Sequence, residues 1–182
     1  MKYKIVFIHS AGPQGRYEGS TGLIHYMKEQ LGSTHEIFTP DMPLPNNPKY
    51  AEWKEVLDLH LDSMDEVILV GHSMGGSTLL KYLSEEEVET DIKALFIVAA
   101  PIWGLEEDWQ KADFHLEQGF EENLGHIRHI ALFHSEKDGI VPKKHFDCYH
   151  KLIKPDEQRI IESDSHLFEE GLPELVESIK NI

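Results

Sequence analysis

The most informative part of the chain is VILVGHSMGGSTLLKYL, residues 67–83. Four apolar residues lead into a serine flanked by glycines, and a run of helix-forming residues follows. This order predicts a buried strand, a tight turn and a helix. The turn carries the pattern G-x-S-x-G, whose glycines let strand and helix approach closely and leave the serine hydroxyl exposed. Ser73 is therefore a candidate nucleophile; the alternative interpretation is a small residue in a structural turn.

The rest of the chain repeats the order strand, then helix. Most of its apolar runs are continuous rather than alternating, as in parallel strands that are covered by helices on both faces. We therefore predict an α/β fold with right-handed crossovers. The predicted strands are residues 3–8, 35–39, 66–70, 94–99, 129–134 and 158–162, and the predicted helices are residues 17–31, 49–64, 75–83, 143–153 and 166–182.

Composition limits the partners of this chain. Its 182 residues fit one domain, 1–182, and its formal charge of -16 repels phosphate backbones and anionic membranes. We expect no nucleic-acid partner and no membrane association, and no feature of the sequence identifies a protein partner. The chain has one cysteine, Cys148, and no apolar run long enough for a signal peptide or a membrane span, so we expect a cytoplasmic protein.

Two segments interrupt the repeating pattern. Residues 39–50 hold four prolines, which predicts an irregular surface loop. Residues 103–127 form an unusually long connection between the fourth and fifth strands, which predicts a small helical cap. Trp103 and Trp109 in this cap could line an apolar substrate pocket, or they could only anchor the cap to the body of the protein.

A serine nucleophile needs a base and an acid that orients the base. If Ser73 is a nucleophile on a turn of this kind, the acid and then the histidine are expected to follow it along the chain. Asp138 lies just beyond the fifth strand and His166 just beyond the sixth, at the edge of the sheet where open α/β folds hold their sites. We therefore predict Ser73, Asp138 and His166 as a catalytic triad.

Other candidate residues have weaker positions. Asp138 before a glycine could also be only a turn residue. Among the other acids, Asp164 is too close in sequence to His166, and Glu106, Asp108 and Asp91 are less well placed along the chain. No metal site is predicted, because no histidine, cysteine or acidic cluster has known zinc spacing. Cys148 on a predicted helix is expected to be a packed or idle thiol.

Acyl chemistry also needs backbone donors for the oxyanion. The N–H of Met74 at the start of the helix after Ser73 is one candidate. The loop FIHSAGPQG after the first strand supplies the other, with Ala11 as the first choice and Ser10 as the second. Ser10 is also expected to contact substrate. The alternative is a flexible loop with no role in the chemistry.

With these features in order, the chain resembles the α/β-hydrolase superfamily over nearly its whole length. The short chain and MPLPNNPKYAEW after the second strand look like the small serine hydrolases typified by retinoblastoma-binding protein nine. The resemblance implies a three-layer α/β/α sandwich with a doubly wound, six-stranded parallel sheet in the order 2-1-3-4-5-6. It also implies Ser73 as nucleophile, Asp138 as acid and His166 as base. Ser10 and Ser165 stand where the family often has glycine.

The expected activity is hydrolysis of esters with small or medium acyl chains through an acyl-enzyme, without a cofactor. Cleavage of thioesters or lactones, and acyl transfer, would use the same residues and stay open at this point. A protein-binding module that keeps the fold without the activity is a further alternative, although the presence of serine, aspartate and histidine argues against it.

Overall fold

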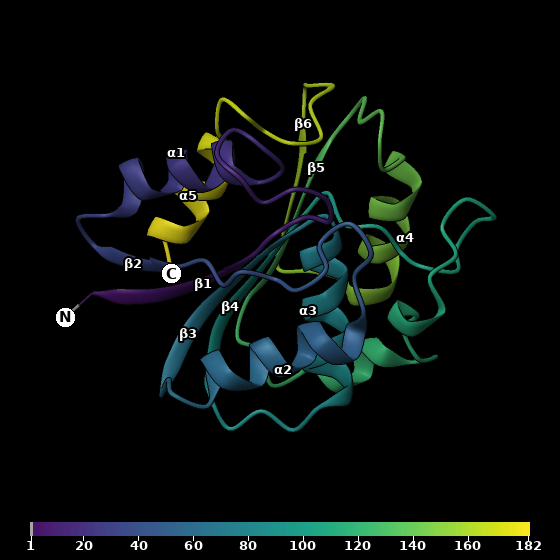
Figure 1. Cartoon of the computed structure of the whole chain (residues 1–182), viewed down its shortest axis with the longest axis horizontal. Coiled ribbons are helices and arrows are strands. Elements are labelled where there is room, and N and C mark those ends of the chain that lie inside the picture. The colour runs from purple at the N-terminus through teal and green to yellow at the C-terminus, as the bar shows by residue number, and fades with distance from the viewer. Residues whose placement is uncertain (1) are drawn as a thin grey trace.

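The computed structural model describes residues 2–182, in which strands and helices alternate along the chain (Figure 1). The strands are β1 (Tyr3–Ile8), β2 (His35–Phe38), β3 (Glu66–His72), β4 (Asp91–Val98), β5 (Ile130–Ser135) and β6 (Glu157–Ile161). The helices are α1 (Thr21–Leu31), α2 (Tyr50–Leu61), α3 (Met74–Glu85), α4 (Lys143–Ile153) and α5 (Pro173–Lys180), with two short 3-10 helices, η1 (Ala112–Phe114) and η2 (Phe120–Leu124).

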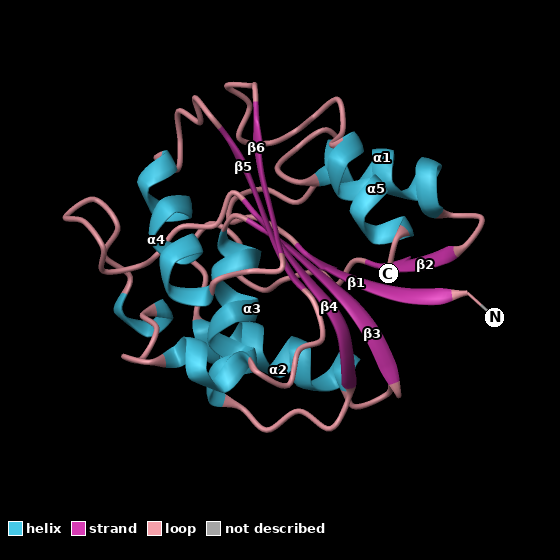
Figure 2. Ribbon diagram, turned by 180° about the vertical axis from the view of Figure 1, so that it is seen from behind, coloured by secondary structure: helices cyan, strands magenta, loops and turns pink. Residues whose placement is uncertain are grey.

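All the strand pairs of the six-stranded sheet are parallel, and the strand order is β2-β1-β3-β4-β5-β6. Helices α1 and α5 cover one face of the sheet, and α2, α3 and α4 cover the other (Figure 2). The prediction of a doubly wound, three-layer sandwich is therefore confirmed. Because the strands are parallel, their carboxyl ends all meet at one edge of the sheet, and the loops that leave this edge can form a common site.

Burial on both faces explains the continuous apolar runs of the strands. In β3, Val67 and Leu69 pack into the core beneath α2, α3 and α4, whereas Ile68 and Val70 pack into the core beneath α1 and α5. Successive side chains of a strand point to opposite faces. A strand that lies between two helical layers therefore has to be apolar at every position.

The largest errors of the sequence prediction concern two helix starts. The predicted helix at 166–182 is wrong over residues 166–172, because Gly171 has a φ of 101° and α5 begins only at Pro173. Proline is favoured at the first position of a helix, where no N–H is needed. Similarly, α1 begins at Thr21 rather than at residue 17, since Tyr17 and Gly19 have φ values of 66° and 53°.

The segment predicted as a cap, residues 103–127, contains 3-10 turns rather than α-helices and lies along α3. Its buried side chains Phe114, Phe120 and Leu124 join the core on the α3 side of the sheet. Three hydrogen bonds attach the segment at successive points of α3: Trp103 Nε1–H to Ser77 Oγ (3.0 Å), Lys81 Nζ–H to His115 O (2.8 Å) and Asn123 Nδ2–H to Ser84 O (2.9 Å). The contacts therefore extend away from the end of α3 that carries Ser73.

None of the helices within residues 2–182 is both long enough and apolar enough to cross a membrane.

Candidate active site

Ser73 occupies a strained turn between β3 and α3. Its φ is 53° and its ψ is -117°, a conformation that a residue with a side chain rarely adopts. The flanking glycines permit the turn. A Cβ on Gly75 would lie 2.2 Å from the carbonyl oxygen of Ile8, and a Cβ on Gly71 would lie 2.7 Å from that of Gly75. The pattern G-x-S-x-G is therefore required by close backbone contacts.

The structure brings the three residues of the predicted triad into one hydrogen-bonded chain. His166 Nε2 lies 3.0 Å from Ser73 Oγ, and His166 Nδ1 lies 2.7 Å from Asp138 Oδ2. Asp138 comes from the loop after β5 and His166 from the loop after β6, so the parallel sheet brings together residues that are 28 and 93 positions apart. The three residues are nearly buried, with exposed fractions of 8–9%.

The carboxylate of Asp138 is oriented by its own loop. Its Oδ1 accepts hydrogen bonds from the N–H groups of Ile140 (2.8 Å) and Val141 (2.9 Å), which leaves Oδ2 for His166. Burial by itself would raise the pKa of Asp138, but the hydrogen bond and charge of His166, with the two N–H donors, outweigh burial and hold the pKa below its usual value. Asp138 is therefore ionised at neutral pH.

Three hydrogen bonds fix the position of the loop after β1. The N–H of Ser10 donates to Ser20 Oγ (2.9 Å), and the N–H of Gly12 donates to Pro45 O (2.7 Å). The third joins Gln14 Oε1 to the N–H of Met42 at 3.0 Å. Pro45 and Met42 belong to the proline-rich loop, residues 39–50. That loop therefore stabilises the segment predicted to supply an oxyanion donor.

The two predicted oxyanion donors have free N–H groups. Neither the N–H of Met74 nor that of Ala11 has an acceptor within residues 2–182, whereas the N–H of Ser10 is bonded to Ser20. Met74 is the first residue of α3, where the unpaired N–H groups of a helix attract negative charge. Of the two choices in the β1 loop, Ala11 is therefore better suited to an oxyanion than Ser10.

The two tryptophans of the cap segment make contacts that anchor it. The ring centroid of Trp103 lies 5.3 Å from that of Trp109, and its Nε1–H is bonded to Ser77. Trp109 packs in turn against His145 of α4 at 5.1 Å. Ser77 is one helical turn beyond Ser73, so Trp103 also remains a candidate wall of a substrate pocket. The substrate contacts expected for Ser10, Trp103 and Trp109 stay predictions.

In the part of the chain that the structure describes, the other acidic residues considered for the triad form no hydrogen bond or ion pair with His166. Asp164 and Asp108 are exposed to solvent, and Asp91 at the start of β4 pairs with Arg128. Glu106 faces the α4 residues Lys144 and His145. Within residues 2–182 no group of three or more His, Cys, Asp or Glu side chains is arranged to hold a metal ion, and Cys148 is a half-buried free thiol on α4.

Two residues near Ser73 were not assigned a specific role from the sequence. Neither His72 nor Ser20 is among the site residues predicted from the sequence. In the structure Ser20 Oγ lies 2.8 Å from His72 Nδ1, and His72 Nε2 lies 2.8 Å from the carbonyl oxygen of His166. Ser20 and His72 are 52 residues apart, so no local pattern could have revealed this pair.

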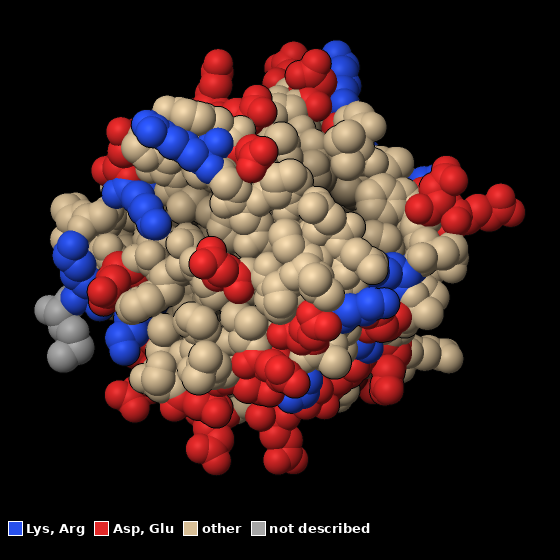
Figure 3. Space-filling model, viewed as in Figure 1, with Lys and Arg blue, Asp and Glu red and all other residues tan. Residues whose placement is uncertain are grey.

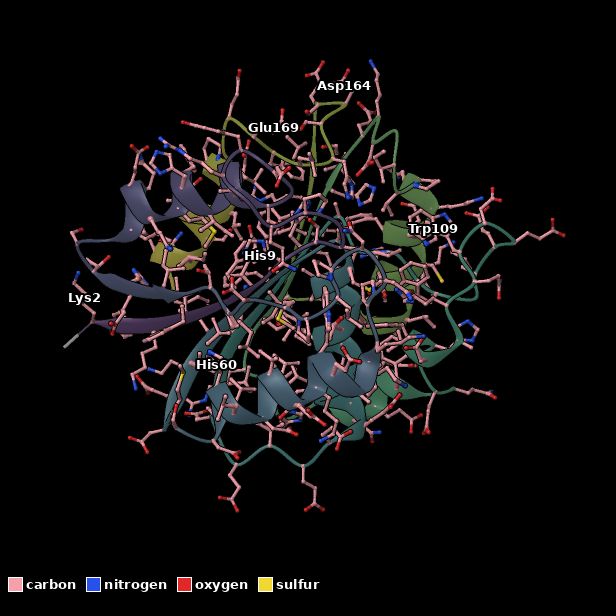
Figure 4. All side chains as sticks on the ribbon, in the orientation of Figure 1. Lys2, His9, His60, Trp109, Asp164 and Glu169 are labelled. Atoms are coloured by element: carbon pink, nitrogen blue, oxygen red, sulfur yellow. The ribbon has the colours of Figure 1, made fainter. Side chains whose placement is uncertain are left out.

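The surface seen in the orientation of Figure 1 is mostly uncharged in its middle (Figure 3). His9, the residue after β1, lies near the middle of the view in Figure 4. In the same orientation the middle of the surface is mostly free of charged side chains, and Asp and Glu gather along its lower edge (Figure 3). With a formal net charge of -16, the protein as a whole repels anions but not neutral groups.

Comparison with known sequences gives the family. The model of the alpha/beta hydrolase family matches residues 5–162, which is most of the chain. The chain belongs to the α/β-hydrolase family. A search of curated protein sequences finds no significant match. The narrower likeness to hydrolases typified by retinoblastoma-binding protein nine is not tested by these results and stays a prediction.

Solved structures share this α/β-hydrolase fold at low sequence identity. The ydeN gene product from B. subtilis is 19% identical with a TM-score of 0.84, over 99% of this chain and 98% of that one. Est1E from Butyrivibrio proteoclasticus is 17% identical with a TM-score of 0.68, over 99% and 86%. The methylesterase protein MES16 from Arabidopsis is 14% identical with a TM-score of 0.69, over 99% and 100%.

Proposed function

We propose that this α/β-hydrolase is a serine esterase that cleaves uncharged carboxylic esters with small or medium acyl chains. The observation that carries the proposal is the position of His166, whose Nε2 lies 3.0 Å from Ser73 Oγ while its Nδ1 lies 2.7 Å from the ionised Asp138. Asp138 holds the imidazole proton on Nδ1, which leaves the lone pair of Nε2 directed at the serine hydroxyl.

In the first half of the reaction, His166 Nε2 takes the proton of Ser73 as Oγ bonds to the ester carbonyl carbon. The carbonyl oxygen becomes an oxyanion, which accepts hydrogen bonds from the N–H groups of Met74 and Ala11. The bond from carbon to the alkoxy oxygen then breaks, and the Nε2 proton goes to the departing alcohol. An acyl group remains on Ser73.

In the second half, a water molecule replaces the alcohol. His166 Nε2 takes one proton of the water as its oxygen bonds to the acyl carbon, and the oxyanion forms again between Met74 and Ala11. The bond to Ser73 Oγ breaks, and the proton on Nε2 returns to Oγ. The carboxylic acid leaves, and the enzyme is restored.

Three further observations support the proposal. The strained backbone of Ser73 costs about 1–3 kcal/mol, which a purely structural serine would not require. The formal net charge of -16 favours a neutral substrate over an anionic one. Finally, Est1E and MES16 share the fold, and MES16 is described as a methylesterase.

A fluorophosphonate probe, which modifies activated serines, tests the proposal directly. We expect the folded protein to be labelled at Ser73, the Ser73→Ala variant to remain unlabelled, and the Ser84→Ala control to be labelled like the wild type. Ser84 is a buried serine near the far end of the same helix. Equal labelling of the wild type and Ser73→Ala would refute the proposal, as would an unlabelled wild type.

A series of p-nitrophenyl esters with increasing acyl length then measures the size of the pocket. Parallel assays with a thioester, a lactone and an added alcohol acceptor distinguish ester hydrolysis from the reactions that the same residues could perform. We expect the highest kcat/KM for an ester with a short or medium chain.

A further inference from the structure

His72 connects three loops of the candidate site. It is the last residue of β3, directly before Ser73, and its side chain is fully buried. Both ring nitrogens have partners on other loops: Nδ1 lies 2.8 Å from Ser20 Oγ, and Nε2 lies 2.8 Å from the backbone carbonyl oxygen of His166. Any buried histidine needs partners for its ring nitrogens; here the two partners lie on different loops, so the ring joins those loops.

The partners determine where the proton of His72 lies. The carbonyl oxygen of His166 can only accept, so His72 Nε2 must carry the proton and donate it. In the neutral ring Nδ1 is then an acceptor, to which the hydroxyl of Ser20 donates a hydrogen bond. Ser20 Oγ in turn accepts the N–H of Ser10 at 2.9 Å. The result is a directed chain from Ser10 through Ser20 and His72 to the His166 carbonyl.

The surroundings keep His72 neutral. Burial, followed by the positive charge of His166, lowers the pKa of His72 to about 3. Its ring centroid lies 5.2 Å from that of His166, and Phe168 packs against it in a T-shaped arrangement with centroids 6.3 Å apart. A neutral ring is compatible with the cation that forms on His166 during the proposed reaction, whereas a charged ring at this distance would oppose that cation.

We propose that His72 is a positioning residue. It holds the backbone of His166 in the position at which His166 Nε2 lies within hydrogen-bond distance of Ser73 Oγ. Through Ser20 and Ser10 the same ring steadies the β1 loop, so that Ala11 can present its N–H to the oxyanion. The inference rests on the proposed esterase function and adds to it a residue outside the triad.

Two substitutions of His72 distinguish the effect of its hydrogen bond to the His166 carbonyl from that of its hydrogen bond to Ser20. Gln places an amide N–H near the position of ring Nε2, within reach of the His166 carbonyl. Asn places an amide oxygen near the position of Nδ1 but has no donor that reaches that carbonyl. Misplacement of a catalytic group by about 1 Å costs about 10²-fold in rate. We expect His72→Asn to lose about that factor in kcat at unchanged KM, and His72→Gln to recover most of the loss.

A spectroscopic measurement makes the test independent of substrate. The proton shared by His166 Nδ1 and Asp138 gives a far-downfield ¹H NMR signal when the two groups are held together. We expect this signal in the wild type and in His72→Gln, and its loss or broadening in His72→Asn. His35→Asn is the matched control, since His35 is also buried on a strand and bonded to a hydroxyl, that of Thr34, but lies on β2. It should keep both the signal and the kcat of the wild type.

The possible results are distinguishable. A folded His72→Asn protein with the wild-type NMR signal overturns the inference, whatever its turnover. If the protein hydrolyses no ester, the proposed function fails, but the signal still shows whether His72 positions His166. If neither His72 variant folds, Ser20→Ala carries the test: a tenfold fall in kcat without a change in KM supports the inference, and wild-type kcat overturns it.

Discussion

His166 and Asp138 are joined by a hydrogen bond of 2.7 Å between Nδ1 and Oδ2, while the other oxygen of Asp138 is held by two backbone N–H groups. The carboxylate therefore cannot turn away from the imidazole without losing both backbone bonds. This arrangement sets the tautomer of His166 and leads to the first prediction.

Asp138→Asn should reduce kcat by about 10⁴-fold with little change in the fold. The amide oxygen of Asn will take the place of Oδ1, because the N–H groups of Ile140 and Val141 require an acceptor. The amide NH₂ then faces His166 Nδ1 and moves the imidazole proton to Nε2, where it blocks proton transfer from Ser73. Steady-state ester hydrolysis measures the loss.

Asp164→Asn is the control for this change. Asp164 is exposed and only two residues from His166, so its replacement alters the local charge without touching the triad. Its kcat should equal that of the wild type. Near-normal turnover by Asp138→Asn, or an equal loss in both variants, would remove Asp138 from the proposed mechanism.

Gly75→Ala should destabilise the protein by about 3 kcal/mol, because extra atoms in a closed space force the backbone to move. The new Cβ would lie 2.2 Å from the carbonyl oxygen of Ile8, and this neighbour is backbone rather than a flexible side chain. Urea unfolding measures the change in the free energy of unfolding.

Gly125→Ala provides the comparison, since its Cβ would have no neighbour nearer than 4.0 Å and its φ is -64°. This variant should stay within about 0.5 kcal/mol of the wild type. Equal stability of the two variants would show that β3 and α3 do not approach as closely at Gly75 as the structure indicates.

Acid should destabilise the native state through His72. Its pKa falls from 6.5 to about 3 on folding, chiefly through burial and then through the charge of His166; the hydrogen bond to the His166 carbonyl and the charge of Asp138 oppose this fall, and the charge of His9 adds to it. Between these pH values the unfolded chain binds a proton that the native state excludes, so the free energy of unfolding falls as the pH falls. The expected loss from His72 is about 2 kcal/mol between pH 7 and pH 5.

A comparison with His72→Gln isolates this contribution. Other buried histidines titrate equally in both proteins, whereas Gln has no proton to gain. Urea unfolding at pH 7 and pH 5 should therefore show a smaller loss of stability in His72→Gln than in the wild type, by about 2 kcal/mol. Parallel losses in the two proteins would contradict the prediction.

Trp103→Leu should shift the preference of the enzyme toward longer acyl chains. Trp103 is bonded to Ser77, one helical turn beyond Ser73, and its proposed role is to wall the acyl-binding pocket, so a smaller side chain there should leave room for a longer chain. One additional methylene in an apolar pocket changes kcat/KM by about tenfold or more. The ratio of kcat/KM for long and short p-nitrophenyl esters measures the shift.

Phe120→Leu is the matched change in the same segment. Phe120 packs against Tyr149, with ring centroids 6.5 Å apart, and should affect stability without altering chain-length preference. If Trp103→Leu behaves in the same way, Trp103 only anchors the segment.

The architecture is predictable from the sequence because the physical signals that specify the strands and turns are local. Continuous apolar runs such as that of β3 indicate strands buried on both faces, and the glycines around Ser73 indicate close contact between strand and helix. Helix starts were less predictable. The loop that carries His166 was partly assigned to a helix, since the φ of 101° at Gly171 depends on packing against Tyr26 as well as on the residue type.

The amino-acid sequence alone was sufficient to predict the parallel sheet and the positions of Ser73, Asp138 and His166 along its carboxyl edge. Chain order and the continuous apolar runs carry that information. Only the tertiary structure revealed the hydrogen bonds from Ser20 through His72 to the His166 carbonyl, and the attachment of residues 103–127 along α3. These contacts join positions that are 26–94 residues apart, and their formation depends on how the packed layers place the loops rather than on any local pattern.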